Sequence, residues 1–117
     1  AEQPVEMKKC LASVDLKRLN GSMKQRLFEK MPFKSQRNIG TCALEWAWLA
    51  AGRTQLLLHG GEKFWDYAAG CLLLAESAGI SSTDTRSPIF NNSLQSRPVI
   101  AASTPALYNQ WSDFLLD

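Results

Sequence analysis

Hydrophobic and polar positions follow two different spacings along this chain, and each change of spacing marks the start of a predicted element. Short apolar runs between polar or turn-forming residues predict strands over residues 9–15, 35–39, 55–58 and 99–102. Apolar residues at helical spacing predict helices over residues 22–29, 41–51, 65–78 and 105–116. Because strands and helices alternate, we expect one layered α/β domain over residues 1–117, with helices on both faces of a sheet.

Residues typical of caps and breaks stand at the ends of the predicted helices. Ser22 and Thr41 are candidate N-caps, since a side-chain oxygen there accepts from a free backbone N–H group. Pro32 ends the first helix, and Pro105 suits the first position of the last one. Gly52 is typical of the left-handed residue that follows a helix.

Glycine and polar residues predict the connections between these elements. Residues 60–63 are predicted to form a turn, and Gly79 is predicted to stop the helix over residues 65–78. Residues 81–96 are polar and predict a loop, with a possible short strand near residues 89 and 90.

The predicted helix over residues 41–51 is apolar nearly all round. Leu44, Ala47, Trp48 and Ala51 share one face, and most of the remaining surface is apolar as well. Such a helix is buried on several sides. Two interpretations stay open: an internal core helix, or a helix with one face against a second subunit or a missing segment.

Composition narrows the class of protein. With 45% hydrophobic and 21% charged residues in 117, the chain is of ordinary globular composition. A net charge of +2 with scattered basic residues argues against nucleic-acid binding. No apolar run is long enough to span a membrane. The three cysteines have no C-x-x-C spacing, which argues against a disulfide framework or a zinc site and favours a reducing cytoplasm.

The most informative stretch is Trp65-Asp66-Tyr67-Ala68-Ala69-Gly70, which places a carboxylate in the first turn of a predicted helix. Free backbone N–H groups and the helix dipole favour negative charge there. Such an aspartate is most often only a cap. The small residues after Tyr67 are expected to let this helix approach the sheet closely.

Several segments resemble, in order and spacing, the C-terminal half of the inositol monophosphatase family, within the superfamily of Mg²⁺-dependent, lithium-sensitive phosphatases. They are RNIGTCAL at 37–44, AAGRT at 50–54, WDYAAG at 65–70, AESAG at 75–79 and VIAA at 99–102. The W-D-x-A-A-G segment is the specific part of this resemblance. It implies an α-β-α domain with a mixed sheet, corresponding to the C-terminal domain of that fold.

The resemblance also implies what this chain lacks. Family members hold their metals mainly through an N-terminal glutamate and a D-P-[IL]-D-G-[TS] loop, and no such loop occurs here. We therefore expect the chain to supply one Mg²⁺ ligand, Asp66, and part of the substrate wall. The N-terminal half would lie on a missing segment or a partner chain, so an oligomer is expected and the isolated chain is expected to be inactive.

The resemblance assigns substrate contacts to Gly40, Thr41 and Cys42 at a helix start, to His59, and to Asp66. Thr41 is read more simply as a cap. His59 stands where inositol-specific members carry a glutamate, and histidine suits a more anionic substrate. At Ala78 this chain also departs from the E-A-G-G turn of the family.

Two classes of function remain open from the sequence. The first is a phosphomonoesterase that hydrolyses a sugar, inositol or nucleotide phosphate by metal-activated water. The second is a non-catalytic interaction module that keeps the phosphatase fold, with Asp66 as a helix cap.

Overall fold

The computed structural model describes residues 4–37, 41–62, 64–89 and 97–117, with only the backbone of residues 62, 64–66 and 97. Within these residues five strands form one sheet in the order β2-β1-β3-β5-β4. The strands are β1 (Leu11–Asp15), β2 (Ser35–Gln36), β3 (Leu56–Glu62), β4 (Ile80–Ser82) and β5 (Arg97–Ala102). The helices are the 3-10 turn η1 (Met7–Lys9), α1 (Gly21–Glu29), α2 (Cys42–Ala50), α3 (Phe64–Glu76) and α4 (Pro105–Leu116).

The sheet is mixed, as expected. Strand β1 pairs in parallel with both β2 and β3, whereas β5 runs antiparallel to β3 and β4. The strands other than β5 therefore share one direction, and the carboxyl ends of neighbouring β1 and β3 lie at the same edge of the sheet. Residues that follow these two strands are thus brought together.

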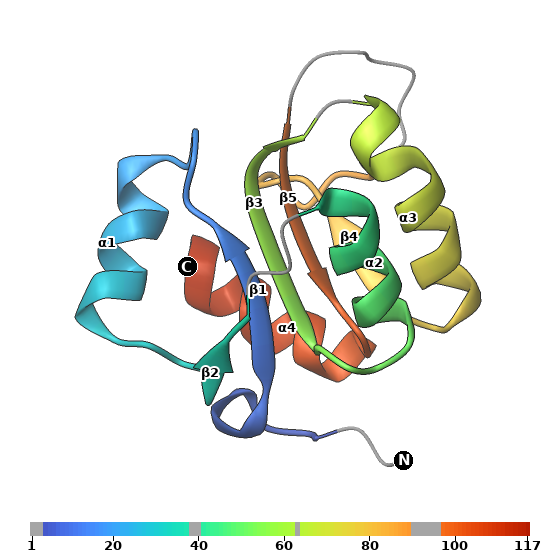
Figure 1. Ribbon diagram of the computed structural model, residues 1–117. Coiled ribbons are helices and arrows are strands. Elements are labelled where there is room, and N and C mark those ends of the chain that lie inside the picture. Colours follow the sequence, from blue (N-terminus) through green and yellow to red (C-terminus); the bar gives the residue numbers. More distant parts are fainter. Residues whose placement is uncertain (1–3, 38–40, 63, 90–96) are drawn as a thin grey trace.

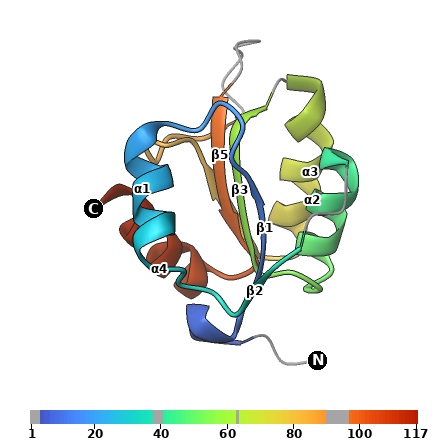
Figure 2. The ribbon, with the colours of Figure 1, turned by 60° about the vertical axis from the view of Figure 1, so that its left-hand side comes forward.

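Helices cover both faces of the sheet, which confirms the predicted α-β-α layering (Figures 1 and 2). Helices α1 and α4 lie on one face, and α2 and α3 pack together on the other. The central strand contributes to both cores: Leu56 and Leu58 join the α1/α4 side, and Leu57 joins the α2/α3 side. A strand buried on both faces requires such an unbroken apolar run.

Helix α2 is buried on one side only, so the internal-helix interpretation is wrong for its outer face. Trp46 and Leu49 are fully buried. Leu44, however, is 42% exposed.

Among the described residues, no helix is long and apolar enough to cross a bilayer.

Most of the predicted helix ends are confirmed. The Thr41 side chain accepts from the N–H of Leu44 at 3.3 Å, Gly52 has φ 78°, and Pro105 begins α4. The cap of α1 differs from the prediction: the Asn20 side chain, not Ser22, accepts from the N–H of Met23 at 2.9 Å.

The connections after β3 and α3 also differ from the prediction. Gly60 to Glu62 continue β3 with a register irregularity against β5, where a turn was predicted. Ser81 and Ser82, at the start of the predicted loop, form β4 together with Ile80, because this segment pairs with β5. Ile89 lies in a bend, and residue 90 is outside the described residues. Ala78, not Gly79, takes the left-handed position after α3, with φ 69°.

Candidate functional site

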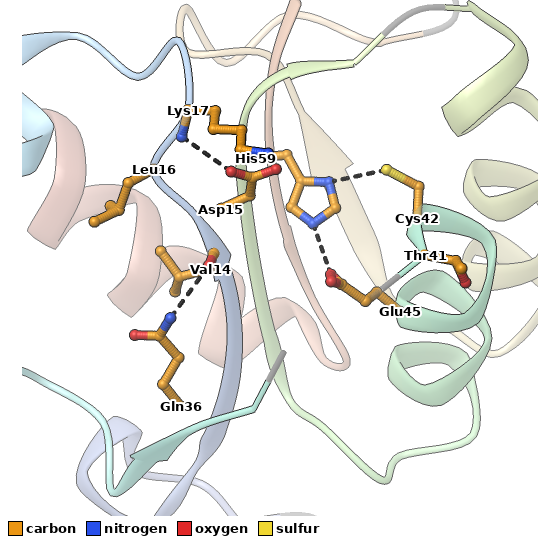
Figure 3. A pocket seen from close by; sticks show the side chains of 9 residues that line it. All are labelled: Val14, Asp15, Leu16, Lys17, Gln36, Thr41, Cys42, Glu45 and His59. Carbon is orange, nitrogen blue, oxygen red and sulfur yellow. Dashed lines mark hydrogen bonds and ion pairs between the residues drawn. The ribbon is translucent and has the colours of Figure 1, made fainter. Parts of the chain in front are cut away.

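A pocket of about 420 Å³ opens where β1 ends and α2 begins, beside His59 of β3 (Figure 3). It is lined by residues from these three elements, from the segment after β1 and from β2: Val14, Asp15, Leu16, Lys17, Gln36, Thr41, Cys42, Glu45 and His59. This is the position at which open α/β sheets commonly bind ligands.

One wall of the pocket is held in place by Gly60. A β-carbon on Gly60 would lie 2.1 Å from the carbonyl oxygen of Lys17 and 2.4 Å from the backbone nitrogen of Leu19. Only glycine allows the backbone after β1 to lie this close to β3. The segment that carries Lys17 is therefore fixed against the end of β3.

Glu45 contributes a buried carboxyl group to the pocket. It lies on α2, one turn after the N-cap Thr41, and is 8% exposed. Its Oε2 accepts a hydrogen bond from the hydroxyl of Ser13 on β1 at 2.6 Å. A buried carboxylate needs such partners, because the cost of removing it from water is otherwise not recovered.

His59 connects Glu45 to the mouth of the pocket (Figure 3). It lies on β3, is 2% exposed, and places Nε2 3.0 Å from Oε2 of Glu45. Its Nδ1 is 3.6 Å from Sγ of Cys42. An ionised Glu45 requires the ring proton on Nε2, so the neutral ring carries none on Nδ1 and can accept from the Cys42 thiol.

Charges of both signs lie at the rim of the pocket. The half-buried Asp15 accepts from the backbone N–H of Lys17 at 2.9 Å through Oδ1. The side chain of Lys17 is exposed and borders the pocket. With the N-terminus of α2 at its wall, the pocket can bind an anionic or hydroxyl-bearing group in a defined orientation.

The structure brings together three of the residues predicted from the sequence. Thr41, Cys42 and His59 all line the pocket. Gly40 lies outside the described residues. The backbone of Asp66 is in the first turn of α3, as predicted, but its carboxylate also lies outside the described atoms.

A metal site is not formed by the described residues alone. Among the described side chains, which do not include those of Glu62 and Asp66, no group of three or more His, Cys, Asp or Glu could hold a metal ion. The described side chains therefore do not by themselves provide the several oxygen ligands that Mg²⁺ prefers.

Sequence reasoning missed Glu45 and Ser13, which form the base of the site with His59. A signal for Glu45 was present, because a glutamate on a helix that is otherwise almost entirely apolar must either reach water or find a buried partner. No comparable signal existed for Ser13, since a serine inside an apolar strand is common.

Comparison with known protein families and with individual proteins points to the same family in both cases. A model of the inositol monophosphatase family matches residues 1–113. Inositol monophosphatase 1 of Sus scrofa is 34% identical over 77 residues, which is 66% of this chain and 27% of the pig protein.

The fold has the same relatives. The crystal structure of inositol monophosphate-bound SaIMPase-II, a staphylococcal protein, matches with a TM-score of 0.82 at 18% identity, over 99% of this chain and 44% of that one. Its 2′AMP-bound structure matches with a TM-score of 0.79 at 20% identity, over 95% and 43%. The chain thus spans less than half the length of these relatives.

Proposed function

The chain belongs to the inositol monophosphatase family, and from this we propose that it forms the C-terminal, substrate-facing part of a Mg²⁺-dependent phosphomonoesterase. The substrate would be a sugar, inositol or nucleotide phosphate. The observation that carries this proposal is the polar pocket at the carboxyl end of β1, with His59 of β3 and the start of α2 in its wall.

The residues of the pocket have separate roles in this proposal. Gly40, Thr41 and Cys42, which precede or begin α2 in the sequence, would donate backbone N–H groups to the hydroxyl or phosphate oxygens of the substrate, because a helix N-terminus favours negative charge. Lys17 would add a cationic group at the rim. Binding of phosphorylated ligands by the staphylococcal relative supports this assignment.

His59 would act on the substrate mainly through its position. Both ring nitrogens have partners within the chain, Glu45 and Cys42, so the ring is held in one orientation. We propose that it shapes the pocket and, when protonated, favours a more anionic substrate than inositol monophosphate.

Asp66 would supply one metal ligand from the first turn of α3. When bound, Mg²⁺ would supply an activated water and charge neutralisation at the phosphate. Because the D-P-[IL]-D-G-[TS] loop of the family does not occur in this sequence, we propose that further ligands come from a segment outside this sequence or from a partner chain. The isolated chain would then be inactive.

The protein would work in the cytoplasm, where its free cysteines would stay reduced.

A titration followed by NMR tests the pocket separately from catalysis. Amide signals of Thr41, Cys42 and His59 would be followed while inositol monophosphate, 2′-AMP, a sugar bisphosphate or a nucleoside 3′,5′-bisphosphate is added, with and without Mg²⁺. Phosphate release would be measured in the same samples. We expect shifts at the pocket without phosphate release, and a Mg²⁺-dependent part that disappears in Asp66→Asn.

The control variant is Asp84→Asn, on the turn after β4, which is separated from β3 by β5. It should behave as the wild type does. An absence of shifts at millimolar ligand would overturn the substrate pocket. Phosphate release that Asp66→Asn abolishes would instead overturn the half-site claim and support a complete enzyme.

A second candidate function, a non-catalytic interaction module, is favoured by the outer surface of α2 and α3. Leu72 and Leu73 are 60% and 46% exposed. A shallow groove of about 310 Å³ runs between the two helices, lined by Ala47, Ala50, Ala51, Leu73, Glu76 and Ser77. Exposed apolar patches of this kind often mark interfaces.

On this second reading a further copy of the chain would cover the groove. Sedimentation equilibrium at 10–200 µM tests this, with Leu73→Lys as the variant. A dimer weakened by Leu73→Lys would support the module, and a monomeric wild type over the whole range would contradict it.

A further inference from the structure

The three cysteines of this chain lie in different chemical surroundings. Cys10 is fully buried, and burial raises the pKa of its thiol to about 11. Cys71 is half-buried with Sγ 3.6 Å from the hydroxyl of Ser81. Cys42 is also half-buried, but it lines the pocket and faces the Nδ1 atom of His59. Of two thiols with similar exposure, Cys42 has a base beside it and Cys71 has a hydroxyl.

With Glu45 ionised, the hydrogen-bond partners of His59 make its ring a suitable base. Glu45 already accepts from Ser13 and takes the Nε2 proton of His59 into a second hydrogen bond. This leaves Nδ1 as the acceptor for the Cys42 thiol proton, and the imidazolium formed on transfer is stabilised by the buried carboxylate. The order thiol, imidazole and carboxylate is that of an activated nucleophile (Figure 3).

The helix adds a second effect at the same sulfur. Cys42 is the first residue of α2, a helix of nine residues. The positive end of the helix dipole stabilises a thiolate at this position. His59 and the N-terminus of α2 therefore both favour the thiolate form of Cys42, and the pocket gives small molecules access to its Sγ atom.

We propose that Cys42 is a reactive thiol that undergoes exchange with small disulfides and thereby closes the pocket with a covalent adduct. The Cys42 thiol passes its proton to Nδ1 of His59, and the thiolate attacks one sulfur of the disulfide. A new S–S bond forms to Cys42 while the original S–S bond breaks. The leaving thiolate takes the proton back from His59, so the added disulfide is the oxidant and no other reactant is needed.

This reactivity is independent of the phosphatase function proposed above. An adduct of a few heavy atoms on Sγ would extend into the pocket of about 420 Å³ that Cys42 lines. Any ligand that uses the start of α2 would then be excluded. Reduction by an external thiol would reverse the block.

Peptide mass spectrometry with cystamine as the probe tests the proposal on the wild-type chain. Rates of modification at Cys10, Cys42 and Cys71 would be measured at pH 7, first in buffer and then in 8 M urea. We expect Cys42 to react at least about tenfold faster than Cys71 in buffer. This ratio should fall to near one in urea, and Cys10 should react only there.

The variant His59→Gln identifies the base. It should lower the rate at Cys42 to about that of Cys71, while the rate at Cys71 stays unchanged. Cys10 reports on folding in the same sample, because its modification in buffer would reveal an unfolded variant. If His59→Gln unfolds, the ratio of the modification rates at Cys42 and Cys71 in the wild type, compared between buffer and urea, still tests the proposal.

Two results would overturn the proposal. The first is a rate at Cys42 equal to or below that of Cys71 in the folded wild type. The second is a Cys42-to-Cys71 ratio that is the same in buffer and in urea, since the sequence near Cys42 rather than the folded geometry would then set it.

Discussion

Gly70 of α3 lies directly against the indole of Trp46 on α2. A β-carbon on Gly70 would come within 2.3 Å of Cγ of Trp46, whose side chain is fully buried. The small residues of the W-D-Y-A-A-G segment were expected to bring the helix close to the sheet. The close approach at Gly70 is instead to the neighbouring helix.

Gly70→Ala should therefore destabilise the fold. The extra methyl group cannot be accommodated without moving a buried indole, and such overpacking costs about 1–3 kcal/mol, partly offset by the better helix propensity of alanine. We expect a net loss of about 2 kcal/mol in the free energy of unfolding, measured by urea denaturation.

Gly21→Ala is the matched control for that experiment. Gly21 begins α1, and a β-carbon there meets nothing within 4 Å. Its effect should stay within about 0.5 kcal/mol of the wild type. Equal losses in the two variants would mean that packing on Trp46 is not the cause.

Ala78→Gly should stabilise the protein. Ala78 has φ 69°, a left-handed conformation that costs an L-residue roughly 1 kcal/mol and glycine almost nothing. We expect a gain of about 0.5–1 kcal/mol in urea denaturation. The control Ala75→Gly, at an exposed position inside α3, should lose about as much. A loss in both variants would contradict strain at Ala78.

Removal of the buried carboxylate should be costly. Glu45→Leu leaves the Ser13 hydroxyl and the His59 ring without their acceptor in a buried place, so we expect a loss of about 3 kcal/mol. Glu45→Gln keeps one carbonyl acceptor and should lose less, about 1–2 kcal/mol. Urea denaturation of both, beside the exposed Glu76→Gln, measures this. If Glu45→Leu is as stable as the wild type, the hydrogen bonds of Glu45 to Ser13 and His59 do not stabilise the fold.

Alkaline pH should weaken the fold through Cys10. Burial raises the pKa of this thiol from 9.0 to about 11, so the unfolded chain ionises first. The contribution of the neutral thiol to stability is complete below pH 9 and is lost as the pH rises to about 11. The difference in free energy of unfolding between wild type and Cys10→Ala should thus shrink from pH 8 to pH 11. A constant difference would contradict a buried neutral thiol.

Elements with strong local signals could be predicted closely from the sequence. Helix α4 begins at Pro105 and ends at Leu116, as its proline and the spacing of its apolar residues predict. Elements that depend on pairing were predicted less well. Strand β4 is short and polar at Ser81 and Ser82, and only the adjacent edge of β5 makes it a strand.

The candidate site shows the same division between local and long-range information. Thr41 and the first-turn position of Asp66 follow from local patterns. The contact between Glu45 and His59 does not, because 14 residues and a change of element separate them. Periodicity along a chain cannot show which side chain of a helix faces which strand.

The close approach at Gly60 has a consequence for affinity. Because the backbone of Lys17 and Leu19 rests on β3, the wall of the pocket already has its shape before any ligand arrives. A ligand that fits this shape would have little loop entropy to remove on binding, so more of its contact energy would appear as affinity. Discrimination between ligands would then come from fit to a rigid wall, and a side chain at position 60 would relax that selectivity.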